Sequence, residues 1–111
     1  MPDLAERPTL AAFQAYVAEL EAERGFADQT PVEKCLLLGE EVGELFKAVR
    51  RVQGLPVDPT TAIGGVADEL ADILIFLCSI ANRYDVDLEA AFRDKEVINK
   101  SRSWTARTAA G

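Results

Sequence analysis

The strongest constraint on the fold is one stretch with clear start and stop signals for a long helix. Thr30, Pro31 and Glu33 supply a side-chain cap, a proline in the first turn and a capping-box partner. The helical pattern runs to about Gln53 and is followed at once by glycine and proline, which end helices. Because a helix of this length needs apolar partners along it, the stretch favours an all-α architecture.

Three further segments carry helix signals, and no alternating strand pattern competes with them. The first helix is expected to begin after Thr9 and to end at Gly25. The third should begin after the 54–65 connector and end at about Tyr84, and the fourth should run from the Asp87 cap to about Ser101. The sequence therefore predicts one domain over residues 1–111. We expect a bundle of about four helices, built around a hairpin of the second and third, with a frayed tail at 105–111.

The overall composition excludes several classes of protein. The formal net charge is −7 and no extended basic stripe is present, so we expect no nucleic-acid partner. Cys35 and Cys78 lack metal-site spacing, and the chain has no histidine, so both are expected to be small core residues in a reducing compartment. The N-terminus lacks secretory features, and the longest apolar run, 73–81, is too short to span a bilayer. These features predict a cytoplasmic protein with no membrane partner.

The second helix places three carboxylates on one face. At about 100° per residue, Glu40, Glu41 and Glu44 lie together, opposite an apolar stripe. A solvated acidic face is the simplest interpretation. However, Gly39 and Gly43 interrupt the same two turns, and each costs about 1 kcal/mol relative to alanine in a helix interior. Close approach of another backbone or a ligand would explain the two glycines.

The third helix carries a glutamate inside its apolar stripe. Glu69 shares a face with Val66, Ile73 and Phe76, where an unpaired charge is strongly disfavoured. Asp72 lies one turn later, so the two acids repeat the i,i+3 spacing found in the second helix. Antiparallel packing would bring four carboxylates to one point. A network of ion pairs would satisfy them, but an all-oxygen group suits a hard divalent ion such as Mg²⁺ or Mn²⁺ better.

The fourth helix adds a basic edge. Lys95, Asn99 and Arg102 recur on one face at i, i+4 and i+7. They are either an ordinary solvated stripe or a receptor for polyphosphate oxygens. Together with carboxylates and a divalent ion, a basic edge indicates metal-assisted cleavage of a phosphoanhydride.

These motifs resemble those of the MazG-like, all-α nucleoside triphosphate pyrophosphohydrolase family. The segment EEVGE at 40–44 is similar to the family's EExxE element, and ELAD at 69–72 is similar to its ExxD element. The segment KEVINKSRSW, at 95–104, resembles the closing K-x₃-N-x₂-R. The similarity extends from about Leu36 to Trp104.

The resemblance implies an activity and a set of roles. It implies Mg²⁺-dependent hydrolysis of a (deoxy)nucleoside triphosphate to the monophosphate and pyrophosphate, in nucleotide-pool sanitation, with Mn²⁺ as a possible substitute. The implied metal ligands are Glu41, Glu44, Glu69 and Asp72; Glu40 would orient or deprotonate the attacking water beside the catalytic Glu41; and Lys95, Asn99 and Arg102 would hold phosphates. Phe13, Phe26 and Trp104 are candidates to stack on the base, although each is more often a core residue.

Some choices stay open at this stage. Phosphoribosyl-ATP pyrophosphohydrolase resembles the same fold and acidic motif, and a helical interaction module that binds a metal without turnover is the rival from another class. Short members of the family include dCTP and dUTP hydrolases, so the resemblance favours pyrimidine deoxynucleotides. The third helix is apolar nearly all round over 73–81. This pattern, with the resemblance, predicts a homodimer or homotetramer that assembles through a four-helix-bundle core.

Overall fold

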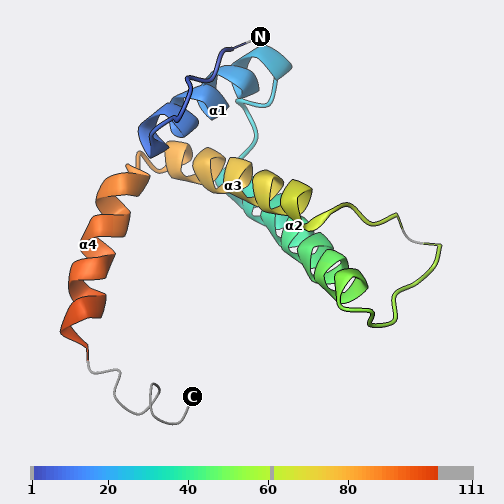
Figure 1. Ribbon diagram of the computed structural model, residues 1–111. Coiled ribbons are helices and arrows are strands. Elements are labelled where there is room, and N and C mark those ends of the chain that lie inside the picture. The colour runs from blue at the N-terminus through green and yellow to red at the C-terminus, as the bar shows by residue number, and fades with distance from the viewer. Residues whose placement is uncertain (1, 61, 103–111) are drawn as a thin grey trace.

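The computed structural model describes residues 2–60 and 62–102, and within these ranges all regular structure is α-helical (Figure 1). The four helices are α1 (Leu10–Arg24), α2 (Pro31–Val52), α3 (Val66–Arg83) and α4 (Leu88–Ser101). The all-α prediction with four helices is confirmed. The expected frayed tail at 105–111 lies outside the described residues.

Local sequence signals set most of the helix ends. The Thr9 hydroxyl accepts from the backbone of Ala12 at 3.0 Å, and Asp87 caps α4 in the same way. Thr30 and Glu33 form the full capping box. Gly25 ends α1 with a φ of 79°, a left-handed conformation that glycine adopts without strain. The cap signals in the sequence therefore fix where α1, α2 and α4 begin.

The long α2–α3 hairpin dominates the arrangement of the helices (Figure 1). Helix α1 packs against α3, near the end of the hairpin opposite the 53–65 connector. Helix α4 starts at the C-terminal end of α3, contacts α1 and then extends away from the hairpin. No helix in the described part of the chain is both long and apolar enough to cross a membrane.

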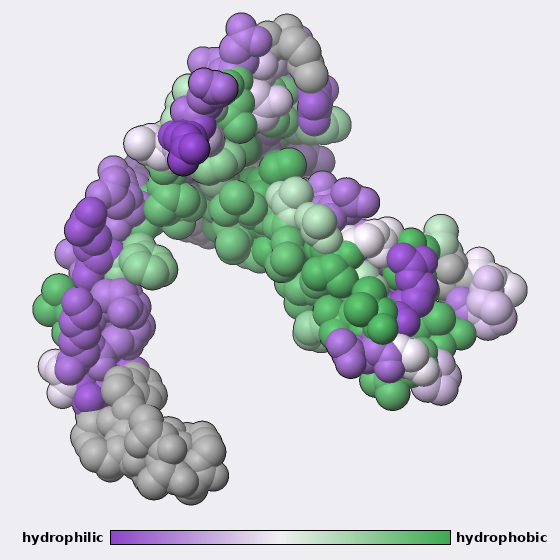
Figure 2. Space-filling view, viewed as in Figure 1, coloured by the Kyte–Doolittle hydropathy of each residue, from purple (hydrophilic) through white to green (hydrophobic). Residues whose placement is uncertain are grey.

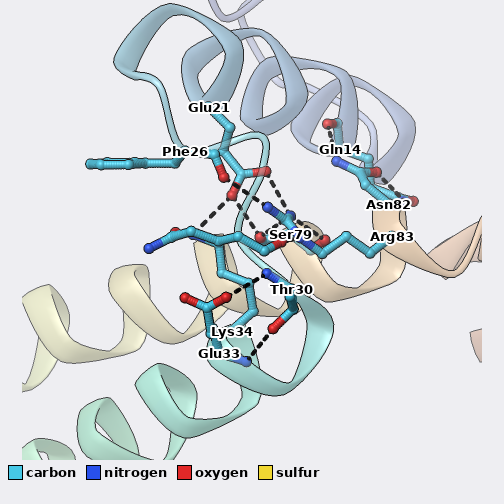
Figure 3. A network of polar contacts seen from close by, with 10 residues as sticks. Gln14, Glu21, Phe26, Thr30, Glu33, Lys34, Ser79, Asn82 and Arg83 are labelled. Atoms are coloured by element: carbon cyan, nitrogen blue, oxygen red, sulfur yellow. Dashed lines mark hydrogen bonds and ion pairs between the residues drawn. The ribbon is translucent and has the colours of Figure 1, made fainter.

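A buried polar network joins α1 to the hairpin (Figure 3). The Glu21 carboxylate accepts from Ser79 Oγ at 2.7 Å and pairs with Lys34 Nζ at 3.0 Å and Arg83 Nη1 at 2.9 Å. Burial raises the pKa of Glu21, but the hydrogen bonds from Arg83, Ser79 and Lys34 outweigh burial and hold that pKa below its usual range. The network thus replaces apolar packing where three helices meet.

The apolar core of a single chain is small. Among the described residues, the buried hydrophobic side chains are those of Val17, Leu20, Ala48, Cys78 and Ala81. Many larger ones stay exposed, and Figure 2 shows hydrophobic surface gathered over the hairpin, whereas α4 is mostly hydrophilic. The prediction for Cys78 is confirmed, but the prediction for Cys35 is wrong, since it lies exposed on α2. Cys35 directly follows the buried Lys34 and so lies about 100° round the helix from the inner face.

Candidate active site

Three of the predicted acids converge between α2 and α3. Carboxylate oxygens of Glu41, Glu69 and Asp72 all lie within 4.8 Å of one another. Glu41 comes from the middle of α2, and the other two come from the first two turns of α3. The antiparallel hairpin therefore brings together acids that are far apart in the sequence.

Glu69 is the buried member of this group. It is 7% exposed, and its Oε2 atom has no hydrogen-bond partner within the described part of the chain. A buried carboxylate oxygen without a donor is costly unless a cation meets it. With two further carboxylates within reach and no nitrogen or sulfur ligand, the donor set fits a hard divalent cation such as Mg²⁺ or Mn²⁺.

The neighbouring carboxylates make Glu41 harder to deprotonate. Contact with the Glu69 carboxyl group, partial burial and the charges of Asp72, Glu69 and Glu44 raise the pKa of Glu41 to about 7. Without a cation, the group therefore holds on to a proton near neutral pH. A divalent ion would replace this proton.

The other two acids of α2 lie outside the group of three. Glu44 is close enough for its charge to act on Glu41, and it forms a half-exposed ion pair with Lys47 at 3.5 Å. Glu40 is exposed and faces a shallow hollow that is also lined by Glu33 and Leu36. A Cβ atom added to Gly39 or Gly43 would meet no atom of residues 2–60 and 62–102 within 4 Å, so packing among these residues does not explain the two glycines.

The basic edge lies far from the acids within one chain. Lys95 and Arg102 are exposed, and Asn99 Nδ2 donates to Glu96 Oε2 at 2.9 Å. Helix α4 leaves the end of α3 opposite to Glu69 and runs away from the hairpin (Figure 1). A single chain therefore does not assemble the phosphate-binding part of the predicted site.

A cavity of about 240 Å³ opens beside the carboxylates, with Asp72 on its wall. Phe26 and Phe76 line it, and Lys34 Nζ lies 5.5 Å and 5.4 Å from the centres of their rings. Among the candidates for base stacking, Phe26 faces this cavity, Phe13 lines a separate apolar pocket, and Trp104 lies outside the described residues.

The sequence reading missed Lys34 and Phe76 as cavity residues. Lys34 is 4% exposed, and it precedes Leu38 and Glu41 by four and seven positions, which places it on the inner face of α2. A lysine at such a position is a signal of a buried cation with a specific partner. Phe76 carried a weaker signal, since its position fits an ordinary core residue.

Residues 29–103 match the family described as the MazG nucleotide pyrophosphohydrolase domain. The dATP/dGTP diphosphohydrolase of Cyanophage S-2L is 34% identical over 96 residues, which cover 81% of this chain and 79% of that protein.

Solved structures agree with these sequence matches. One is a MazG-like pyrophosphohydrolase from Cyanophage S-2L, bound to dGDP and three catalytic Mn²⁺ ions per active site. It superposes on this chain with a TM-score of 0.68 at 30% identity, and the match covers 91% of this chain and 87% of that one. The iMazG protein from Vibrio DAT 722 has a TM-score of 0.61 at 31% identity, covering 86% and 98%. The expected enzyme class and divalent-metal cofactor are confirmed at the level of the family. The chain belongs to the MazG nucleotide pyrophosphohydrolase domain family.

Proposed function

We propose that this enzyme hydrolyses purine deoxynucleoside triphosphates between the α and β phosphates, giving the monophosphate and pyrophosphate. The observation that carries the proposal is the buried Glu69 carboxylate, whose Oε2 atom has no partner among the described residues, beside Glu41 and Asp72. The purine preference is supported by the similar phage enzyme, which acts on dATP and dGTP. It replaces the pyrimidine preference expected from the resemblance.

The proposed metal ligands are Glu41, Glu69 and Asp72, with Glu44 completing the set on the α2 side. A bound Mg²⁺ or Mn²⁺ would supply charge neutralisation and Lewis-acid activation at the phosphates. Glu40, the exposed neighbour of Glu41 in the sequence, would orient or deprotonate the attacking water from the solvent side.

We place the nucleoside in the 240 Å³ cavity that Asp72 borders. Phe26 and Phe76 offer apolar faces to a base, and the Lys34 and Glu21 pair closes the inner wall. A nucleoside in this cavity directs its phosphates toward the carboxylates. The cavity thereby links the recognition of the base to the position of the scissile bond.

The phosphate-binding edge of α4 completes the site through self-association. Lys95, Asn99 and Arg102 lie on a helix that stands apart from the acids of its own chain (Figure 1). In a homodimer or homotetramer, a second copy that packs on the exposed apolar flank of the hairpin would bring its own α4 near the carboxylates. Such packing would also cover hydrophobic surface that a monomer leaves in water.

Product analysis tests the proposed reaction. We expect release of pyrophosphate from dATP and dGTP with Mg²⁺, slower turnover of dCTP and dUTP, and no turnover of phosphoribosyl-ATP. In H₂¹⁸O, attack on the α phosphorus places the label in the monophosphate. Formation of a nucleoside diphosphate and orthophosphate as first products would overturn the proposed cleavage position. Equal rates on all four nucleotides would overturn the purine preference.

A further inference from the structure

The connector between α2 and α3 ends in two adjacent glycines that differ in one respect. A Cβ atom placed on Gly64 would lie only 2.5 Å from Oε1 of Glu69, far inside ordinary contact. A Cβ atom on Gly65 would approach nothing closer than Oδ2 of Asp68 at 3.7 Å, which is normal van der Waals contact. The Glu69 carboxylate therefore lies in space that exists because residue 64 has no side chain.

Backbone conformation does not account for Gly64. Among the described residues, the glycines with positive φ are Gly25 and Gly54. Alanine could adopt the backbone angles of residue 64 without strain. The need for glycine at this position is spatial, and the space is occupied by a carboxylate of the proposed metal site.

The backbone around Gly64 is held from the end of α2. Arg51 donates from Nη1 to the Ile63 carbonyl at 3.1 Å and from Nη2 to the Gly64 carbonyl at 3.3 Å. On the other side, the Glu69 amide donates to the Gly65 carbonyl at 3.1 Å, in the first turn of α3. These bonds fix the distance between the Gly64 backbone and the base of the Glu69 side chain.

We propose that Gly64 is a positioning residue of the metal centre, with Arg51 holding it in place. The open space at Gly64 lets the Glu69 carboxylate lie against the connector and face Glu41 and Asp72, with its second oxygen left for a cation. The inference rests on the proposed function, in which Glu69 is a metal ligand. Because a methyl group at residue 64 would displace only the end of a flexible side chain, it moves the ligand at little cost to folding.

The test measures Mn²⁺ affinity of the full chain by electron paramagnetic resonance, without substrate. We expect Gly64→Ala to weaken Mn²⁺ binding by about 10- to 100-fold, as loss of support for a metal ligand typically does. Gly65→Ala is the matched control and should bind Mn²⁺ as the unaltered chain does. Circular dichroism should show the same helix content in all three.

A double-mutant cycle separates positioning from general packing. A Glu69→Asp background keeps a carboxylate for Mn²⁺ but is one methylene shorter and so withdraws from residue 64, and Gly64→Ala should there cause no further loss of affinity. An equal loss in both backgrounds, or unchanged affinity in Gly64→Ala, would overturn the proposal. If Gly64→Ala fails to fold, Arg51→Gln provides the test instead, because it keeps the glycine but removes the hydrogen bond to its carbonyl. Unchanged Mn²⁺ affinity in Arg51→Gln would then overturn the proposal. Failure of the unaltered chain to bind Mn²⁺ would instead reject the proposed function.

Discussion

Glu69 is the buried member of the three carboxylates that converge between α2 and α3. It is buried, its Oε2 atom lacks a donor, and its carboxyl group is the largest influence on the protonation of Glu41. A cation is the partner that satisfies all three observations. The same residue should therefore be essential for metal binding and dispensable for folding.

Replacing Glu69 by glutamine tests this directly. We expect Glu69→Gln to reduce Mn²⁺ binding and turnover by orders of magnitude, because an amide oxygen carries no charge for the ion. Thermal stability of the metal-free protein should stay the same or rise, since one repelling charge is removed. Asp68→Asn is the control: it removes a charge from the same turn of α3, outside the group of three. Loss of helix content in Glu69→Gln would favour a purely structural role.

The pKa of Glu41, about 7 without metal, predicts a pH dependence. The usual pKa of 4.5 applies to the unfolded chain, so between pH 4.5 and about 7 the folded state holds the extra proton. Protonated Glu41 therefore adds to the stability of the metal-free protein. This contribution is complete below pH 4.5 and is lost as the pH rises through about 7. Metal must displace the proton, so Mn²⁺ affinity should rise over the same window. Calorimetry in two buffers of different ionisation enthalpy should detect proton release near pH 6, and its absence would contradict this assignment.

At the level of the elements, α1 is joined to the hairpin by a charge network rather than by apolar packing alone. Glu21 from α1 meets Lys34 from α2 and Arg83 from α3, and all three side chains are largely withdrawn from water. Lys34 also lies between the rings of Phe26 and Phe76. This network forms the inner wall of the proposed nucleoside cavity.

Glu21 and Lys34 should respond unequally to substitution. Glu21→Gln leaves Lys34 buried without its anionic partner and should cost about 3 kcal/mol or more in urea unfolding. Lys34→Met should cost less, because Glu21 keeps Arg83 and Ser79. The stabilisation from Glu21 is present above its usual pKa of 4.5 and is lost as the pH falls through its lowered folded value. Equal destabilisation by the two substitutions would show that Arg83 is not an effective partner.

The helices were predictable from sequence, whereas the buried charge network was not. Caps such as Thr30 and Asp87 act on the nearest turn, so their effect can be read locally. The convergence of Glu41 with Glu69 was also predictable, because matching i,i+3 acids on two antiparallel helices face each other. The Glu21 network depends on how three helices pack, and the space at Gly64 depends on the path of a connector, neither of which periodicity encodes.

At the scale of the whole molecule, the described part of the chain leaves several large apolar side chains exposed to water. Leu70 is 51% exposed, Leu77 43% and Phe92 68%, and an apolar groove of about 520 Å³ lies between α3 and the start of α4. Figure 2 shows this hydrophobic surface continuing over the hairpin. A second copy is the partner that would also bring α4 to the acids.

We therefore expect a dimer or tetramer in light scattering at micromolar concentration. Leu77→Glu should shift the protein toward monomer and lower turnover together, because burying a charge in an apolar interface is unfavourable. Val32→Glu, which also adds a charge at an exposed apolar position but lies outside the groove, should leave the assembly intact. A folded and fully active monomer of the unaltered chain would show that one copy is sufficient.

Glu41 precedes the 53–65 connector in the sequence and Glu69 follows it, so a metal ion held by both would resist unfolding of the hairpin. A divalent ion held by Glu41 and Glu69 would be a removable cross-link, closing a chain loop much as a disulfide does but without oxidation. At a metal concentration 100 times the Kd, such a ligand adds about 2.7 kcal/mol to the free energy of unfolding. Protease digestion of the connector should slow as Mn²⁺ is added, so that the supply of divalent metal sets the lifetime of the enzyme as well as its rate.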